Sequence, residues 1–227
     1  PDDPRIAHSM NLTTDRFGNG THALSIVYPR QGAGHSEEQT RLYATLEESL
    51  LLQCDDEIDW FRHSIPCGAR SFEIHHLKSL YQAEKFALDG AEGLRKQFEQ
   101  FFKITNDGSL FQDEIELLKA LDHAEMPAGE QPQLRLLTDN RIKYTDNDLR
   151  TPLPFGQVTS HAIPYETYTL AFTDPILAQP RLGNKITPDL LEESGYQSSE
   201  MLFQENERKW WIPSGRQLYF SPYYQDD

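Results

Sequence analysis

The sequence predicts a mainly β fold with a helical insertion, an α+β arrangement built from short hairpins. Several stretches alternate apolar and polar residues with a period of two, which is typical of strands that bury one face. A helical period interrupts them over residues 91–124. Prolines then break the last third into short pieces, at positions 152, 154, 164, 175, 180 and 188. We expect hairpins over 1–90, a helix-loop-helix insertion over 91–125, and hairpins over 126–227 with a short helix near 187–194.

The first element is a β-hairpin within residues 11–30. Its turn is DRFGNG at 15–20, where Gly18 and Gly20 can take positive φ and Asn19 tolerates it. After the turn, alternate residues share a face of the predicted strand. One face holds Ala23, Ser25 and Val27, and the other holds Leu24, Ile26 and Tyr28.

The next segment, residues 39–54, fits either a helix or a pair of strands. The run Leu50-Leu51-Leu52 does not decide between them. Residues 55–59, DDEID, predict an acidic loop. Residues 70–77 alternate as a strand, with Phe72, Ile74 and His76 on one face.

The insertion shows two helical patterns. Residues 91–102 carry apolar side chains at positions i, i+4, i+7 and i+8, namely Leu94, Phe98, Phe101 and Phe102. Residues 111–124 carry Ile115, Leu118 and Leu121 at similar spacing. Residues 126–132 give no strong structural signal and are expected to form a loop.

From residue 133 the pattern is again typical of strands. Residues 133–145 and 165–172 alternate, and residues 186–196 predict one short helix closed by Gly195. Near the end stands WWIPSG, in which Trp210 and Trp211 precede a turn at 213–215. We expect a hairpin here, with its rings packed into the sheet.

Bulk composition limits the classes of function. The chain has 227 residues, 37% of them hydrophobic, and a formal net charge of −15. Such a chain repels phosphate backbones, which argues against nucleic-acid binding. No apolar run approaches 18 residues, so no membrane span is expected. Cys54 and Cys67 lack the spacing of a metal or disulfide motif and are expected to be buried small residues or free thiols. The start at Pro1 suggests a trimmed chain or a fragment of a longer protein.

One loop matches part of a calcium-binding pattern. Residues 103–114 place Gly108, Leu110 and Glu114 at the sixth, eighth and twelfth positions of an EF-hand loop. The first position should be aspartate, but Lys103 would place a cation beside the ion. We therefore favour a helical hairpin with an Asn-Asp-Gly turn and Ser109 as the N-cap.

Three other candidate sites have simpler structural interpretations. His75 and His76, with His63 and Cys67, could suggest zinc, but adjacent histidines on a strand point to opposite faces. The carboxylates of Asp55, Asp56, Glu57 and Asp59 could suggest acid–base chemistry, although an exposed acidic turn is favoured. Aromatic clusters could stack sugars, although rings in strands more often pack on neighbouring strands. These clusters contain Tyr165, Tyr168, Phe172, Trp210, Trp211, Tyr219, Phe220, Tyr223 and Tyr224. We assign no catalytic, cofactor-binding or metal-binding residue from the sequence.

The segments in order resemble a known family. They read DPRIAHSMNLTTDRFGN, SIVYPR, EQTRLYATLEES and DWFRHSIPCGARSFEIHHL, followed after the helical part by YTDNDLRTPLPFG, AIPYETYTLAFT and WWIPSGRQLYFSP. This order is similar to the shell-forming segment of the B component of bacterial insecticidal Tc toxin complexes, in the Rhs/YD-repeat family. Residues 15–19 also resemble the Asp-x-x-Gly-Asn turn of a YD-type repeat.

The resemblance implies a structural role without enzymatic activity. In that family the B and C components build a hollow β-cocoon that holds the cytotoxic region of the C component until translocation through the A-component channel. It implies a wall segment of a secreted toxin complex, without cofactors. Its partners would be the remainder of the B component, the C component and, indirectly, the A component, with no contact to nucleic acid or membrane. The alternative is a freestanding β-rich module that binds carbohydrate or protein.

Overall fold

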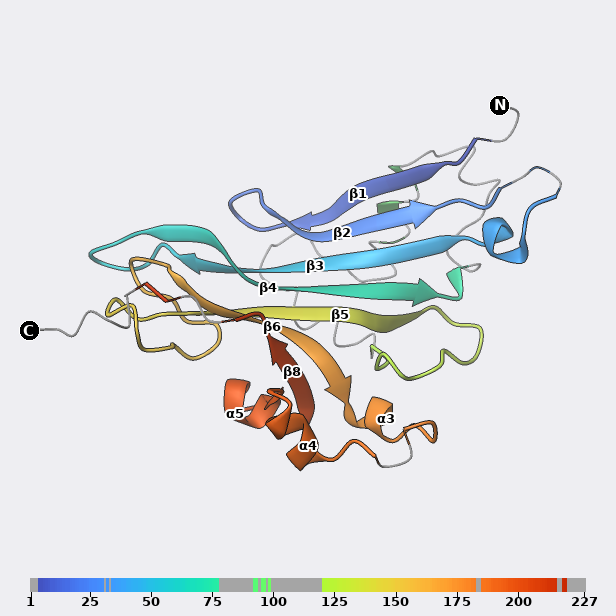
Figure 1. The fold of residues 1–227 in the computed structure, drawn as a ribbon. Helices are drawn as coiled ribbons and strands as arrows, with labels where there is room; N and C mark the ends of the chain where they lie inside the picture. Colours follow the sequence, from blue (N-terminus) through green and yellow to red (C-terminus); the bar gives the residue numbers. More distant parts are fainter. Residues whose placement is uncertain are drawn as a thin grey trace, which may run out of the picture. The chain divides into compact units, whose positions relative to one another are not determined.

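The fold is described by a computed structural model, which covers residues 4–30, 32, 34–77, 92–93, 95–96, 98, 120–182, 185–215 and 218–219. The longer strands are β1 (Ala7–Thr14), β2 (Gly20–Val27), β3 (Tyr43–Cys54), β4 (Arg62–His75), β5 (Gln133–Tyr144) and β6 (Pro164–Thr173). The short strands β7 (Gln197–Ser198) and β8 (Lys209–Pro213) follow. The strands are ordered β1-β2-β3-β4-β5-β6-β8-β7 (Figure 1). The predicted mainly β fold class is confirmed.

The chain divides into two compact units, which we describe separately. The first unit comprises Pro1–Ser49 and Arg70–Leu137, and the second comprises Leu50–Ala69 and Thr138–Asp227. Strands β3, β4 and β5 each contribute residues to both units.

The predicted first hairpin is confirmed. Strands β1 and β2 pair antiparallel from Ala7 opposite Val27 to Thr14 opposite Gly20. The Asp15 carboxylate organises the turn, because its Oδ1 accepts hydrogen bonds from the backbone N–H groups of Phe17 and Asn19, each 2.9 Å long. The Asn19 amide also donates to both carboxylate oxygens. One side chain thus satisfies the donors that the reversing backbone leaves without a strand partner.

Most of the ambiguous segment at 39–54 forms one strand, from Tyr43 to Cys54. A short 3-10 helix, η1 (Glu37–Thr40), precedes β3, which pairs antiparallel with β2 from Tyr43 opposite Val27 to Glu48 opposite His22. Both the helix and the pair of strands that the sequence left open are therefore replaced by a single long strand. The backbone pairing with β2 fixes the side-chain alternation of residues 43–48, which precede the leucine run.

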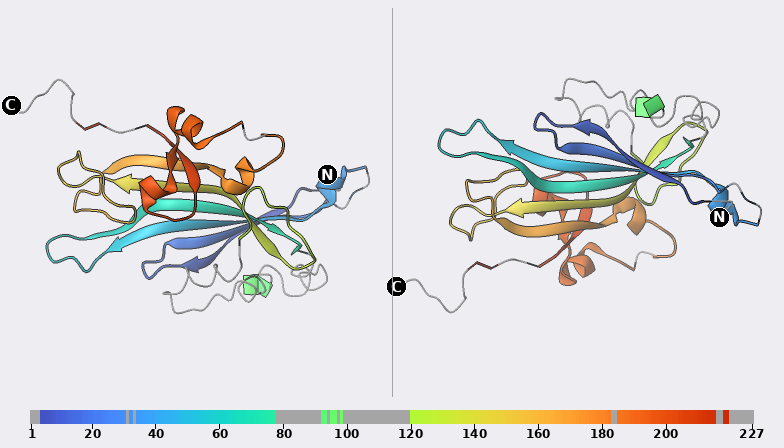
Figure 2. Two further views of the ribbon diagram at one scale, coloured as in Figure 1. Left: turned by 90° about the horizontal axis from the view of Figure 1, so that it is seen from below. Right: turned by 90° about the horizontal axis from the view of Figure 1, so that it is seen from above.

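The first unit buries a continuous apolar core. Strands β1 to β5 contribute to it with alternate residues, as a half-buried sheet requires. Its members are Leu12, Leu24, Ile26, Tyr28, Ala44, Leu46, Phe72, Ile74, Leu77, Phe98 and Leu134. Figure 2 shows the short helical stretch that carries Phe98, in green, beside the blue strands of the first hairpin.

A charged cluster lies at the edge of this core. The Glu48 side chain is 2% exposed, and its Oε2 accepts a hydrogen bond of 2.5 Å from Arg70 Nε. His22 Nε2 lies 3.6 Å from the other carboxylate oxygen, while His22 Nδ1 is 2.8 Å from Thr13 Oγ1. Burial alone would raise the pKa of Glu48, but nearby His22 and the hydrogen bond from Arg70 outweigh it and lower this pKa to about 2. Glu48 is therefore an anion whose charge Arg70 balances.

Two expectations in the first unit are wrong in part. Strand β4 ends at His75, and His76 follows with φ 59°, so it does not continue the face of Phe72 and Ile74. Leu121, expected in a helix, forms an isolated parallel bridge with Arg135. The backbone N–H of Leu121 donates to Leu134 O, and its carbonyl accepts from Leu136, so β5 takes the hydrogen bonds that a helix would have used.

Only part of the predicted insertion lies within the described residues. Residues 92–93, 95–96 and 98 are helical, as the first helical pattern predicts, and Phe98 is buried. Most of the second helical pattern, together with the loop at 103–114, lies outside the described residues. Residues 126–132 form the expected loop.

The second unit sets short helices beside strands β6 and β8 (Figure 2). The helices are α3 (Asp174–Leu177), α4 (Pro188–Glu193) and α5 (Ser199–Phe203). The predicted helix near 187–194 corresponds to α4, where the Thr187 side chain caps the start and Gly195, with φ 88°, follows the end. The N–H of Tyr196 donates to Leu191 O, which closes the helix as the glycine predicts.

The hairpin expected at the WWIPSG stretch is not the arrangement observed. Strand β8 pairs antiparallel with β6 and with the two-residue strand β7. The Ser214 N–H continues this pairing by donating to Thr167 O. After the turn only Leu218 and Tyr219 are described, neither of them in a strand, and the rest of the expected second arm lies outside the described residues. Strand β8 thus finds its partners earlier in the chain, and the expectation that its rings pack into the sheet is confirmed for Trp210 and Trp211.

Replacing Asp15 should loosen the first hairpin. We expect Asp15→Ala to lower the free energy of unfolding by about 1–3 kcal/mol, because several donors lose a charged acceptor. Asp56→Ala is the matched control, since Asp56 is exposed in another loop between two strands. Urea titration measures both variants, and equal midpoints would show that the Asp15 carboxylate does not stabilise the turn.

The Glu48 cluster should make stability depend on acid pH. Because its folded pKa lies below its usual 4.5, ionised Glu48 contributes about 3 kcal/mol above pH 4.5, a contribution lost as the pH falls towards 2. We expect Glu48→Gln to be less stable than the wild type at pH 7. The difference in unfolding free energy should shrink between pH 5 and pH 2 in denaturant titrations. A difference that stays constant over this range would contradict the assignment.

Candidate functional site

The histidines and cysteine that were considered as zinc ligands are not grouped as a metal site within the described residues. His75 Nε2 lies 2.9 Å from Glu73 Oε2, and the same carboxylate accepts a hydrogen bond of 2.5 Å from Arg135. Burial raises the pKa of the Cys67 thiol to about 11, whereas a metal ligand must be a thiolate. Across the described part of the chain, no three His, Cys, Asp or Glu side chains are grouped as metal ligands would be.

The acidic stretch at 55–59 is the loop that the sequence predicts. It joins β3 to β4, and Asp56, Glu57 and Asp59 are exposed there. General acid–base groups act within a positioned, partly desolvated site. Nothing in the described surroundings supplies such a setting for these three carboxylates.

The aromatic residues proposed for sugar stacking are largely internal. Tyr168, Trp210 and Trp211 are 2%, 2% and 0% exposed, while Tyr165 and Phe172 are half-buried. Only Tyr219, at 39%, is clearly exposed among the described members, since Phe220, Tyr223 and Tyr224 lie outside the described residues. The buried rings cannot offer a face to a ligand without unfolding the second unit.

The most organised polar group is instead a buried cation, Arg141 on β5. Its guanidinium carbon lies 4.6 Å from the ring centroids of Phe203 and Trp211, and 5.1 Å from that of Phe155. A cation over an aromatic face is attracted by the ring quadrupole, and the attraction strengthens when water is excluded. Arg141 is only 8% exposed. We call Arg141 and these three rings, with the two acids described next, the Arg141 cluster.

Two carboxylates balance the buried charge. Arg141 Nη1 donates to Glu205 Oε1 at 2.5 Å, and Nη2 lies 3.3 Å from Asp139 Oδ2. Asp139 and Arg141 are two residues apart on β5, so their side chains leave the same face of the strand. Glu205 follows α5, after Gln204 takes a left-handed conformation with φ 58°. The ion pair therefore fastens the end of α5 to the sheet.

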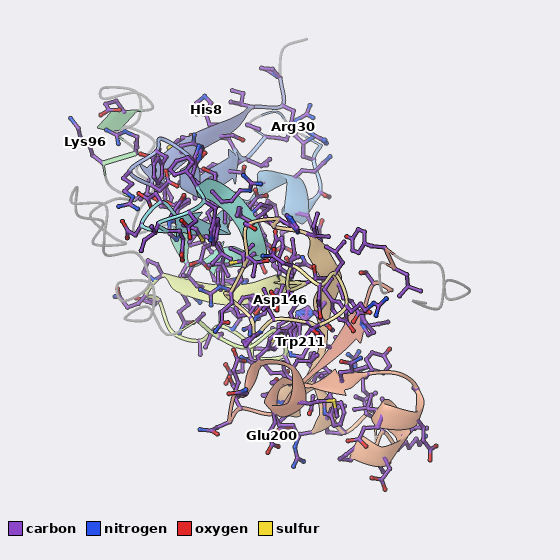
Figure 3. The ribbon with its side chains drawn as sticks, turned by 90° about the vertical axis from the view of Figure 1, so that its left-hand side faces the viewer. His8, Arg30, Lys96, Asp146, Glu200 and Trp211 are labelled. Carbon is purple, nitrogen blue, oxygen red and sulfur yellow. The ribbon has the colours of Figure 1, made fainter. Side chains whose placement is uncertain are left out.

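The rings of the cluster also contact one another edge to face. Phe203 is the centre of the group, with ring centroids 4.9 Å from Trp211, 5.3 Å from Phe155 and 5.8 Å from Tyr168. Figure 3 shows Trp211 next to the helix that carries Glu200, which is α5. Interplanar angles of 70° to 87° place ring edges against ring faces, the arrangement that aromatic quadrupoles favour.

Ser199, at the start of α5, connects this helix to β8 through hydrogen bonds of its side chain. Its hydroxyl accepts hydrogen bonds from the Lys209 N–H at 3.0 Å and from Trp211 Nε1 at 3.2 Å, and donates to Lys209 O at 3.0 Å. Ser199 is fully buried. The indole of Trp211 is thereby fixed through its only polar atom as well as through its rings.

The Arg141 cluster has the properties of a packing interaction that holds α5 against the sheet. Its cation is paired and its rings are packed against each other, while the adjacent Ser199 hydroxyl makes three hydrogen bonds. Such an arrangement holds elements together but offers no free nucleophile or proton acceptor. The sequence interpretation missed Arg141, Asp139 and Glu205. The signal it could have used was the Asp-x-Arg alternation within a predicted strand, which places opposite charges on one face.

Comparison with known proteins gives a match to a toxin family over part of the chain. Residues 1–61 match the family model for the insecticide toxin TcdB middle/C-terminal region. No curated protein sequence matches the chain. This match confirms the resemblance inferred from the sequence over residues 1–61.

The fold resembles that of solved toxin complexes. The crystal structure of TcdB2-TccC3 matches with a TM-score of 0.56 and 23% identity over 96% of this chain. The same complex without its hypervariable C-terminal region gives 0.57 and 23% over 96%, and TcdB2-TccC3-TEV gives 0.56 and 22% over 97%. This chain spans 10% of the length of each of those chains.

Removing the indole of Trp211 should destabilise the second unit. We expect Trp211→Ala to cost about 3–5 kcal/mol of unfolding free energy, as truncation of a buried large aromatic residue does. Trp211→Phe is the matched control, because it keeps a ring against Phe203 and Arg141 and loses only the larger ring and the Ser199 hydrogen bond. Urea melts followed by circular dichroism measure both. An unchanged midpoint for the alanine variant would show that the packing contributes little.

Proposed function

We propose that this chain is a wall segment of the β-sheet shell of a secreted toxin complex, where it helps to enclose a cytotoxic effector before translocation. The observation that carries the proposal is a structural match: 96% of this chain matches a stretch that makes up 10% of a chain in the TcdB2-TccC3 complexes. A stretch that matches only a small part of a large shell protein is expected to act through assembly with the rest of it.

The internal chemistry supports a structural role. In both units the buried charged groups described here, Glu48 and Arg141, are paired with opposite charges and serve packing. We therefore propose that the segment performs no catalysis and requires no cofactor. Within the described residues, no helix is long and apolar enough to cross a membrane.

The expected partners follow from assembly. We propose that the segment adjoins the remainder of a B component, that the shell closes with a C component carrying the effector, and that the A-component channel is reached only indirectly. A formal net charge of −15 argues against contact with nucleic acid. A freestanding carbohydrate-binding module is less well supported, because the rings it would use are mostly buried.

Protease protection of the effector tests the proposal. The complete protein that contains this chain is co-expressed with its C component, and the purified complex is treated with proteinase K. We expect the effector to survive in the wild type and with Trp211→Phe, and to be digested at lower temperature with Trp211→Ala. An effector that is digested equally fast in the wild-type complex and alone would exclude a role in enclosure.

A further inference from the structure

The loop that joins β3 to β4 presents apolar side chains to solvent. We call residues 55–61 the β3–β4 tip; Figure 1 shows it at the end where the two strands meet. Ile58 is 98% exposed and Phe61 is 54% exposed. A single exposed apolar residue needs no explanation, but here two large apolar side chains are exposed three positions apart in one seven-residue loop. Hydration of these groups is unfavourable, so their burial against another surface would contribute favourable free energy.

The stem below the tip is ordered by specific contacts. The Ser64 N–H donates to the Gln53 side chain across the two strands at 2.8 Å, and Ser64 takes a positive φ of 59°. His63 Nδ1 lies 3.0 Å from Ser64 Oγ, and its ring stands edge to face with Phe61 at 5.3 Å between centroids. Phe61 is therefore held in place while exposed, which lowers the entropy lost on binding.

The charge of the tip indicates the kind of surface that it fits. Asp56, Glu57 and Asp59 are exposed around Ile58. Docking the apolar side chains would bring these carboxylates close to the rim of the partner's pocket, where unlike charge attracts and like charge costs free energy. An anionic membrane or a nucleic acid would repel the same group. The complement is a protein pocket with apolar walls and Lys or Arg side chains at its edge.

We propose that the β3–β4 tip docks into an apolar, basic-rimmed pocket of another protein surface within the assembled toxin complex. Ile58 is the central anchor, Phe61 is a second apolar contact, and the acids select the partner by charge. This inference rests on the function proposed above, because assembly supplies the partner. The tip then helps to fix the position of the wall segment, which the Arg141 cluster only stabilises internally.

Photo-cross-linking within the complex tests this inference. The photoreactive residue p-benzoylphenylalanine replaces Ile58 in the complete protein, which is co-expressed with its C component, irradiated and analysed by mass spectrometry. We expect one dominant cross-linked peptide that contains Lys or Arg. We also expect a yield about tenfold lower when Asp56→Lys and Asp59→Lys are added, because the reversed charge opposes the basic rim. The control places the same reagent at Glu130, an exposed residue of the 126–132 loop.

Each outcome of this experiment decides between specific possibilities. Cross-links as diffuse as those from position 130, or no cross-link from a complex that co-elutes normally, would overturn the tip proposal alone. A lipid adduct in place of a peptide would overturn it in favour of membrane contact. If the wild-type proteins do not co-elute at all on size-exclusion chromatography, the proposed function fails first, and the tip loses the partner that the proposal assigns to it.

Discussion

The structure depends on the pairing of buried charge. A chain with only 37% hydrophobic residues must bury one face of several long strands, so charged side chains enter both cores. Glu48 meets Arg70 in the first unit, and Arg141 meets Asp139 and Glu205 in the second. An unpaired charge in either place would cost several kcal/mol, which is a large part of the stability of a typical domain. The strands can therefore hold their faces inward only while these partners remain in register.

The pairs contribute more to specificity than to net stability. Taking two charges out of water offsets most of their attraction, and an apolar pair of the same shape would pack about as well. An apolar pair, however, would tolerate a shifted strand, whereas Arg141 reaches Glu205 only if α5 ends where it does. Slipping a strand by one residue would turn Glu48 or Arg141 to the other face. We infer that these ion pairs help to specify the register of the strands.

The sequence predicted those features that residues close together in the chain determine. The first hairpin follows from Asp15, Gly18 and Asn19, and the end of α4 follows from Gly195, because each of these residues acts within a few positions of itself. Strand β3 was not predicted as a single strand, because Leu50–Leu52 lacks a period, and the pairing of Tyr43–Glu48 with β2 is a contact between segments that no local pattern shows. The Arg141 cluster was missed for a related reason. Arg141 and Glu205 are 64 residues apart, and no local pattern indicates that they meet.

The same reasoning separates a wall from a binding module. A module that stacks sugars must keep its rings at the surface, where each ring loses the burial that would stabilise the fold. Here the rings near Trp211 lie around a paired cation, and Ser199 fixes the indole by a hydrogen bond. These rings contact other side chains of the second unit and are not presented to a ligand. Among the described residues, the groups left at the surface include Ile58 and Phe61, with exposed acids beside them at the β3–β4 tip. Exposed apolar anchors with charged neighbours fit the core and rim of an interface with a neighbouring protein.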